Sequence, residues 1–215
     1  MNANSYSLHQ NDVKMWKYLS GISNGIFLET GASNGIFQSN TKMYEDLGWR
    51  GLLVEPNRKR CEEAKKYRPN SIVENYAVVS SDHSKDTLLG YFDEDVHTLE
   101  AYAIEGNTLY DETAGVGWKQ HTTDPVEAPA ITLKKLLEKH SLDGSSIHFF
   151  SLDVEGYELQ ALDGLDLKVN RPLYIHIEVS DLTQQRYREY LEKQDYVFVE
   201  SIEGAHDDVY RRKEG

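Results

Sequence analysis

Short apolar runs alternate with helical stretches along this chain, and this alternation restricts the possible folds more than any other feature. In the first part of the chain, strands are expected at 25–30, 51–55 and 71–79. Helices are expected between them, at 39–47 and 58–67. A strand–helix–strand order of this kind is typical of parallel βαβ units with right-handed crossovers. The first part of the chain is therefore expected to form one half of a parallel sheet.

The second half of the chain repeats this order and then closes differently. The expected elements are helices at 132–140, 158–165 and 183–194 and strands at 147–153, 173–179, 196–202 and 209–212. Thr183 is the expected N-cap of its helix. A short Gly-containing loop separates the last two strands, which predicts an antiparallel hairpin. We therefore predict an α/β fold, a Rossmann-like doubly wound three-layer sandwich whose mostly parallel seven-stranded sheet ends in a C-terminal antiparallel hairpin.

A length of 215 residues fits one domain, which we expect to span residues 1–215. An N-terminal helix is expected at about 8–20. Residues 93–130 hold nine acidic residues and one basic residue, Lys119, without a sustained period. Because such a segment is too long for an ordinary connection, we interpret it as an insertion.

The insertion also contains Tyr102, Tyr110 and Trp118. Aromatic faces beside carboxylates are common in carbohydrate sites. The same composition suits a solvated flap whose aromatic residues pack back onto the domain. The sequence leaves both interpretations of the insertion open.

The net charge of −13 excludes several classes of partner. Lys and Arg number 23 against 36 Asp and Glu, and no basic patch is segregated. Neither nucleic acid nor an anionic membrane surface is therefore an expected partner. Cys61 is the single cysteine, which excludes a disulfide framework and a multi-thiolate metal site. With no signal peptide evident and no apolar run of ~20 residues, a cytoplasmic location is expected.

The end of the first strand is the expected ligand site, because ligands bind outside the carboxyl ends of strands in open α/β sheets. Gly31 and Gly35 follow that strand, where the backbone must turn tightly. Glu55 ends the second strand and is placed to accept hydrogen bonds from ribose hydroxyls. Ser33 stands where a dinucleotide fingerprint has its middle glycine. A nucleoside ligand without a pyrophosphate is therefore favoured.

Two carboxylates end neighbouring strands in the second half of the chain. Asp153 ends the strand at 147–153, and Glu178 ends the next strand along the chain. Such a pair can hold a hard divalent cation or supply a general base. Glu155 and Glu158 open the following helix, where acids also favour the positive end of the helix dipole. His176, two residues before Glu178, is interpreted as a core histidine with one satisfied hydrogen bond.

Three segments of the chain, in the order in which the family has them, resemble the FkbM-type S-adenosylmethionine-dependent methyltransferases. They are Phe27–Gly35 followed by Ser39–Thr41, Leu47–Asn57, and Ser151–Leu159. The resemblance runs from about Gly25 to Tyr196 and covers the insertion weakly. It implies a class I methyltransferase fold and the transfer of methyl groups to hydroxyls, often on sugars.

The resemblance also implies which residues hold S-adenosylmethionine. Glu29 and the turn from Gly31 to Gly35 would border the methionine part, Glu55 the ribose, and Ala77 and Val78 the adenine, with Asp82 beside them. The expected cofactor-binding residues are Glu29, Gly31, Ala32, Ser33, Asn34, Gly35, Glu55, Pro56, Ala77, Val78 and Asp153.

We therefore predict an S-adenosylmethionine-dependent O-methyltransferase acting on a sugar hydroxyl of a glycan or glycoside. The expected catalytic residues are Asp153, Glu155 and Glu178, and a divalent cation such as Mg or Mn would be held by Asp153 and Glu178. The alternatives are a nicotinamide-dependent oxidoreductase and a non-catalytic binding module of methyltransferase fold. The sequence leaves the sugar, the hydroxyl and the oligomeric state open.

Overall fold

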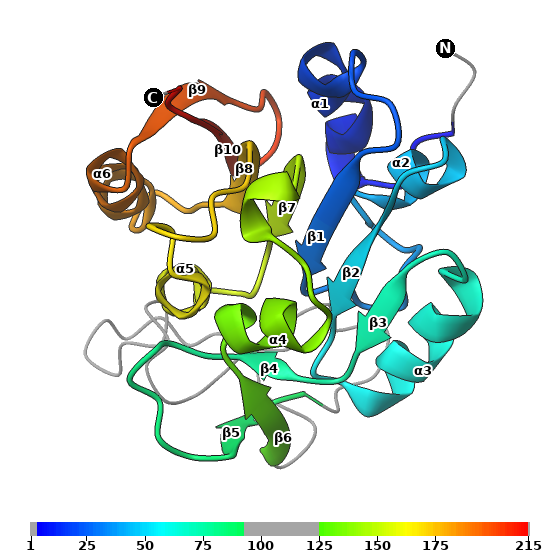
Figure 1. Ribbon diagram of the computed structural model, residues 1–215, viewed down its shortest axis with the longest axis vertical. Coiled ribbons are helices and arrows are strands. Elements are labelled where there is room, and N and C mark those ends of the chain that lie inside the picture. Colours follow the sequence, from blue (N-terminus) through cyan, green and yellow to red (C-terminus); the bar gives the residue numbers. More distant parts are fainter. Residues whose placement is uncertain (1–3, 93–124, 215) are drawn as a thin grey trace.

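The computed structural model describes residues 4–92 and 125–214, and its centre is a seven-stranded sheet in the order β3-β2-β1-β7-β8-β10-β9 (Figure 1). Its strands are β1 (Ile26–Thr30), β2 (Arg50–Val54), β3 (Ile72–Glu74), β7 (Phe149–Leu152), β8 (Tyr174–Glu178), β9 (Tyr196–Ser201) and β10 (Asp207–Arg212). The first five pair in parallel, and β10 is antiparallel to both β8 and β9. The predicted fold class is confirmed, including the C-terminal hairpin.

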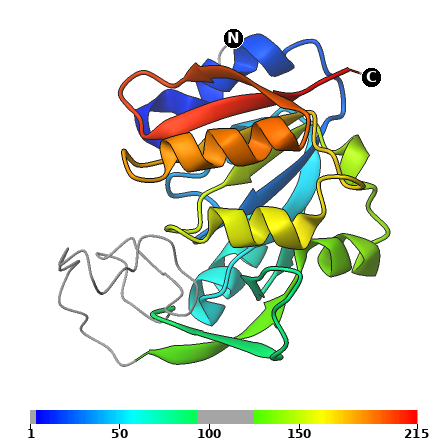
Figure 2. The same cartoon turned by 90° about the vertical axis from the view of Figure 1, so that its left-hand side faces the viewer.

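Helices cover both faces of this sheet (Figures 1 and 2). They are α1 (Asn11–Leu19), α2 (Lys42–Asp46), α3 (Arg58–Tyr67), α4 (Leu133–Lys139), α5 (Glu158–Leu165) and α6 (Gln184–Lys193), with 3-10 turns η1 (Leu8–Gln10) and η2 (Gly144–Ser146). Neighbouring strand residues point to opposite faces, so Phe149 packs with α1 and α2 while Phe150 packs with α4, α5 and α6. Both faces are therefore buried, which explains why the strands are continuous apolar runs.

The third expected strand, at 71–79, is wrong as a single element. β3 joins the large sheet, whereas β4 (Ala77–Val78) joins a second sheet in the order β4-β6-β5. Asn75 causes the separation, because its amide donates hydrogen bonds to the carbonyls of Glu55 and Pro56 at 2.9 and 2.8 Å. The chain thus bends over the end of β2 instead of continuing the sheet.

The second sheet also changes the end of the expected insertion. β6 (Val126–Ile131) pairs in parallel with β4 and antiparallel with β5 (Thr87–Gly90). The regular structure thus resumes inside the range 93–130. The remainder of that range up to residue 124, with Tyr102, Tyr110 and Trp118, lies outside the described residues.

Thr183 does not cap α6 as expected. Its hydroxyl accepts a hydrogen bond from the backbone N–H of Ser180 at 2.8 Å, and its side chain makes no cap bond to the helix. The hydroxyl therefore closes the turn that precedes α6. None of the helices in the described ranges is long and apolar enough to cross a membrane.

A fully buried arginine, Arg68, ties the end of β1 to the segments around it. Its guanidinium pairs with Glu29 at 3.2 Å and with Glu45 at 2.5 Å. It also donates to the Gly35 carbonyl at 3.1 Å and to the Thr41 hydroxyl at 2.8 Å. One side chain from the end of α3 therefore fixes the strand end, the glycine-rich turn and the start of α2.

Arg68→Met is expected to lower the free energy of unfolding by about 3–5 kcal/mol, because it leaves two buried carboxylates without their cation. Lys65→Met is the matched control on α3, since Lys65 pairs with the exposed Glu62 and should contribute little to stability. Urea unfolding of the two variants measures both values. A loss for Arg68→Met no larger than that of the control contradicts this role.

Candidate active site

A cavity of about 360 Å³ lies along the carboxyl ends of the parallel strands. Glu55 after β2, Gly31 after β1, Asp153 after β7 and Glu178 at the end of β8 all line it, and so does Asp207 at the start of β10. Because β10 runs antiparallel to β8, its first residue lies beside the last residue of β8. The cavity therefore follows the sheet edge from β2 to β10.

The glycine-rich turn forms one wall of this cavity. Gly31 has a φ of +73°, and a Cβ there would lie 1.8 Å from the carbonyl oxygen of Asp153, so no other residue fits without a shift. The N–H groups of Gly31 and Ala32 donate to the Val54 carbonyl at 3.1 and 3.2 Å. Gly31, Ala32 and Ser33 line the cavity. The turn thus brings the tips of β1, β2 and β7 into contact.

The later residues of the turn, Asn34 and Gly35, are not among the lining residues. The side-chain oxygen of Asn34 accepts hydrogen bonds from the N–H groups of Ile36 and Phe37 at 3.1 and 2.9 Å. Gly35 has a φ of +78°, and a Cβ there would lie 2.8 Å from Arg68 Cγ. Both residues shape the turn, and a direct contact with a ligand stays a prediction for them.

Glu29 also lies away from the cavity lining. Its buried carboxylate accepts hydrogen bonds from the Asn40 N–H at 2.9 Å and the Thr41 hydroxyl at 2.6 Å, in addition to the Arg68 ion pair. These partners hold the segment that returns from the turn toward α2. The structure thus gives Glu29 a position behind the wall, and the expected contact with a cofactor stays untested.

Glu55 is the buried carboxylate at one end of the cavity. Its two oxygens accept the N–H groups of Ser33 at 2.7 Å and Asn57 at 2.9 Å. Burial raises the pKa of Glu55, while these two bonds and the Arg60 guanidinium act in the opposite direction. Each carboxylate oxygen has a second lone pair, so Glu55 can still accept hydrogen bonds from two ligand hydroxyls.

The wall beside Glu55 is largely apolar. Its lining residues include Pro56, Tyr76, Ala77, Val78, Leu88 and Phe92. The predicted residues Pro56, Ala77 and Val78 are therefore brought together with Glu55. Asp82 is not part of this wall, and its carboxylate accepts a hydrogen bond from Ser80 at an exposed position. An apolar slot with one buried carboxylate suits a nucleoside.

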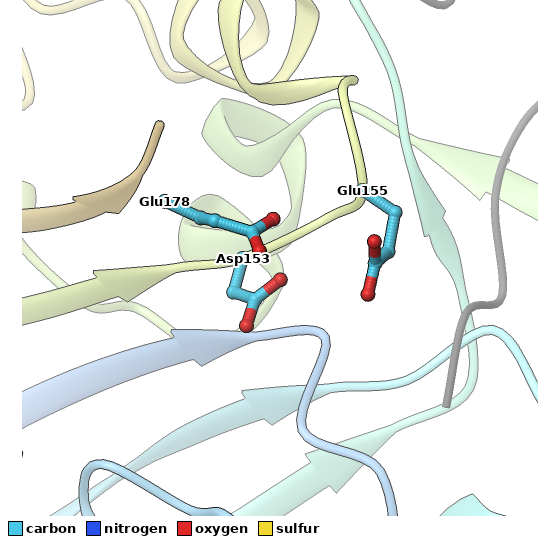
Figure 3. Close-up of side chains that lie close together, drawn as sticks. All are labelled: Asp153, Glu155 and Glu178. Atoms are coloured by element: carbon cyan, nitrogen blue, oxygen red, sulfur yellow. The ribbon is translucent and has the colours of Figure 1, made fainter. Parts of the chain in front are cut away.

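Three acids meet in the middle of the cavity, Asp153, Glu155 and Glu178 (Figure 3). One ligand oxygen from each lies within 4.8 Å of the other two. Figure 3 shows the carboxyl groups of Asp153 and Glu178 side by side, with Glu155 reaching the same space from the loop after β7. The three expected catalytic residues are thus brought together, and a hard cation such as Mg or Mn prefers oxygen ligands of this kind.

Asp153 and Glu178 share a hydrogen bond, so one of the two carboxyl groups holds a proton. Burial raises the pKa of Asp153 to about 7, with further contributions from the charges of Asp207 and Glu158. Burial also raises the pKa of Glu178, and the negative charges of Asp153 and Glu155 raise it further. A pair that holds one proton near neutral pH can accept a proton from a bound hydroxyl.

Glu158 has a structural position instead. Its buried carboxylate accepts the N–H groups of Val154 at 3.0 Å and Gly156 at 3.1 Å and the Tyr187 hydroxyl at 2.6 Å. It therefore closes the loop that carries Glu155. The sequence left this role open, because an acid at the start of a helix is common for electrostatic reasons alone.

His176 is buried in the core against Phe149, with ring centroids 6.2 Å apart. Its Nε2 atom has no hydrogen-bond partner among the described residues and lies 3.7 Å from the Asp207 carboxylate. The core position was expected, whereas the unpartnered nitrogen was not. Burial lowers the pKa of His176.

The far end of the cavity, at Asn11 and Asp207, was missed by the sequence reasoning. Asn11 begins α1, and its amide donates to the Asp207 carboxylate at 2.7 Å. No motif marks either residue. Their meeting depends on the pairing of β10 with β8, which places Asp207 opposite Glu178.

A family model described as the methyltransferase FkbM domain matches residues 29–198 of this chain. A search of curated proteins found no match. Among solved structures, a TehB-like SAM-dependent methyltransferase from Corynebacterium glutamicum is 9% identical, with 94% of this chain and 88% of that chain covered and a TM-score of 0.48. A proposed RNA methyltransferase from Pyrococcus horikoshii is also 9% identical, with 94% and 79% covered and a TM-score of 0.46.

The raised pKa values of Asp153 and Glu178 predict a loss of stability as pH rises in a chelator-containing buffer. The stabilisation that the shared proton gives is complete below the ordinary carboxyl pKa of about 4 and is lost as pH rises through about 7. Asp153→Asn removes the group that loses its proton in this range. Between pH 5 and pH 8 its Tm should therefore fall less than that of the wild type, by about 2–4 °C for each kcal/mol.

Calorimetric melting at both pH values measures this difference. Glu189→Gln is the control, because Glu189 is an exposed carboxylate on α6. If the Tm of Asp153→Asn falls by as much as the Tm of Glu189→Gln and of the wild type, Asp153 does not lose a proton in this range.

Proposed function

Because the chain belongs to the FkbM methyltransferase family, we propose that it transfers a methyl group from S-adenosylmethionine to a sugar hydroxyl of a glycan or glycoside. The observation that carries this proposal is the position of the acids. Asp153 and Glu178 lie in the same cavity as the nucleoside wall around Glu55. A group that can deprotonate a hydroxyl is therefore close to the place where a methyl donor would bind.

The residues at the Glu55 end fit S-adenosylmethionine. Glu55 would accept the ribose hydroxyls, Ala77 and Val78 would border the adenine, and Gly31 and Ser33 would contact the methionine part. When bound, S-adenosylmethionine supplies a methyl group that its positive sulfonium already activates. The nearby acids favour such a cationic ligand by simple electrostatics.

The acids would act on the other reactant. A neutral alcohol is a poor nucleophile, so the acceptor oxygen needs to lose its proton as the new C–O bond forms. Asp153, with a pKa of about 7, would take this proton, and Glu178 would hold Asp153 in place through their shared hydrogen bond. The walls of the cavity would contribute by holding the two reactants in line.

A cation is the second way in which these acids could act. Asp153 and Glu178, with Glu155 as a third ligand, would hold Mg or Mn, which would replace the shared proton and bind the acceptor oxygen. The three ligand oxygens all lie within 4.8 Å of one another, which suits this role. The two mechanisms use the same residues and differ in whether a chelator stops the reaction.

Glu55→Ala is expected to weaken the binding of S-adenosylmethionine by about 1–3 kcal/mol, because two ligand hydroxyls lose their acceptor. Glu62→Ala, at an exposed position on α3, is the matched control. Isothermal calorimetry measures both affinities. An unchanged affinity for Glu55→Ala places the ribose elsewhere, and saturable NAD binding by the wild type supports the oxidoreductase alternative.

Asp153→Asn is expected to lower the rate of methyl transfer by about 10²–10⁴-fold, because the acceptor oxygen loses its base or its cation. The assay follows labelled methyl groups from S-adenosylmethionine to a panel of methyl glycosides. Adding excess EDTA and then Mg or Mn separates the two mechanisms, because only a cation-dependent reaction stops with EDTA and recovers when the metal is added back. Binding of S-adenosylmethionine without transfer to any acceptor supports the non-catalytic alternative.

A further inference from the structure

The cavity continues beyond the acids to an end that neither the cofactor nor the proton transfer uses. Following the sheet order, Glu55 lies at β2, Asp153 and Glu178 at β7 and β8, and Asp207 at β10. Four strand spacings separate β2 from β10, which is about 19 Å. The Asp207 end is therefore on the far side of the acids from the nucleoside wall.

Asn11 is a buried side chain at this end with an unused hydrogen-bond acceptor. It is 4% exposed and lines the cavity. Its Nδ2 donates to Asp207 Oδ2 at 2.7 Å, so the partner fixes which amide atom is the oxygen. The remaining atom, Oδ1, has no hydrogen-bond partner among the described residues. A buried acceptor without a donor is costly, and a ligand hydroxyl would satisfy it.

Asp207 adds more acceptors beside Asn11. Its Oδ1 lies 3.7 Å from His176 Nε2, and its backbone pairs with that of Glu178. Carboxylate oxygens and the amide Oδ1 only accept hydrogen bonds. This end of the cavity is therefore built for a ligand that offers several donors, as the hydroxyls of a sugar do.

Phe37 gives the same cavity an exposed aromatic face. It is 50% exposed and follows the glycine-rich turn, where its N–H is held by Asn34 at 2.9 Å. Leu8, also lining the cavity, is 52% exposed. An aromatic face packs against the C–H face of a sugar ring, while acceptors beside it take the ring hydroxyls.

The wall that carries Asn11 is fixed before any ligand binds. The Asp12 carboxylate accepts the hydroxyls of Ser5 and Ser7 at 2.6 and 2.9 Å and the Tyr6 N–H at 2.8 Å. Lys14, three residues after Asn11 on α1, donates to the Glu203 carbonyl at 2.7 Å, and Lys17 further along the helix pairs with Glu200. These contacts join α1 to the C-terminal hairpin and hold Asn11 against Asp207.

We propose that Asn11, Asp207 and Phe37 form the acceptor subsite and bind one sugar ring. Phe37 packs against the face of the ring, and Asn11 Oδ1 and the Asp207 carboxylate accept hydrogen bonds from its hydroxyls. The target hydroxyl then lies over Asp153 and Glu178. The class of acceptor rests on the proposed function, whereas the position of the subsite rests on the unpartnered Asn11 oxygen and the exposed ring.

Saturation-transfer NMR tests the subsite on the full chain loaded with S-adenosylhomocysteine, with methyl glycosides of hexoses, deoxyhexoses and pentoses as probes. Asn11→Ala and Phe37→Ala are each expected to weaken glycoside binding by about tenfold or more, with unchanged affinity for S-adenosylhomocysteine. Asn70→Ala and Val169→Ala, both exposed and outside the cavity lining, are the matched controls. Phe37→Ala keeps the test valid if Asn11→Ala lowers the Tm.

Each outcome separates the subsite from the proposed function. Glycoside binding that both variants lose supports the subsite, and it does so even if no glycoside is methylated, in which case only the proposed function fails. Equal binding by wild type and variants overturns the subsite, while labelled methyl transfer leaves the proposed function standing. If the wild type binds none of the glycosides, a sugar subsite is excluded.

Discussion

The burial of the Arg68 guanidinium is the interaction on which the rest of the site depends. A charged group in the interior is stable only when opposite charges and acceptors surround it, and here Glu29, Glu45 and the Gly35 carbonyl do so. These partners come from the end of β1, from α2 and from the glycine-rich turn. Because all of these partners bind the same guanidinium, the turn is held in a single conformation. Gly31 can then lie so close to the Asp153 carbonyl that no side chain fits between them.

The cavity itself has the opposite electrostatic character. Arg68 neutralises the acids behind the wall, whereas Asp153, Glu155 and Glu178 face one another at its surface. Burial raises the pKa of Asp153 and of Glu178, and neighbouring negative charges raise both further, so the pair holds a proton or attracts a cation. The protein thus separates acids that hold the fold from acids that line the cavity, and both kinds occur at strand ends of the same sheet, as Glu29 on β1 and Glu178 on β8 show.

Local patterns predicted those parts of the molecule that follow from one rule. Parallel strands have their carboxyl ends at one edge, so Glu55, Asp153 and Glu178 were expected together, and the structure brings them together. The role of Glu29 could not be predicted, because its partner Arg68 is thirty-nine residues away and looks like any residue at a helix end. The split of β3 from β4 depends on the Asn75 side chain, and the Asn11–Asp207 contact joins opposite ends of the chain. Contacts of this range leave no periodic signal.

The hydrogen bonds that join α1 to the C-terminal hairpin have a consequence for how such a protein can diversify. Asn11 and Asp207 lie outside the range 29–198 that the family model matches, whereas Gly31, Glu55, Asp153 and Glu178 lie inside it. The two ends of the chain form one wall, and the middle of the chain forms the rest of the cavity. Exchanging the ends as a matched pair would therefore alter the wall of the cavity without touching the turn, Glu55 or the acid pair, so that new ligand preferences could evolve on an unchanged core.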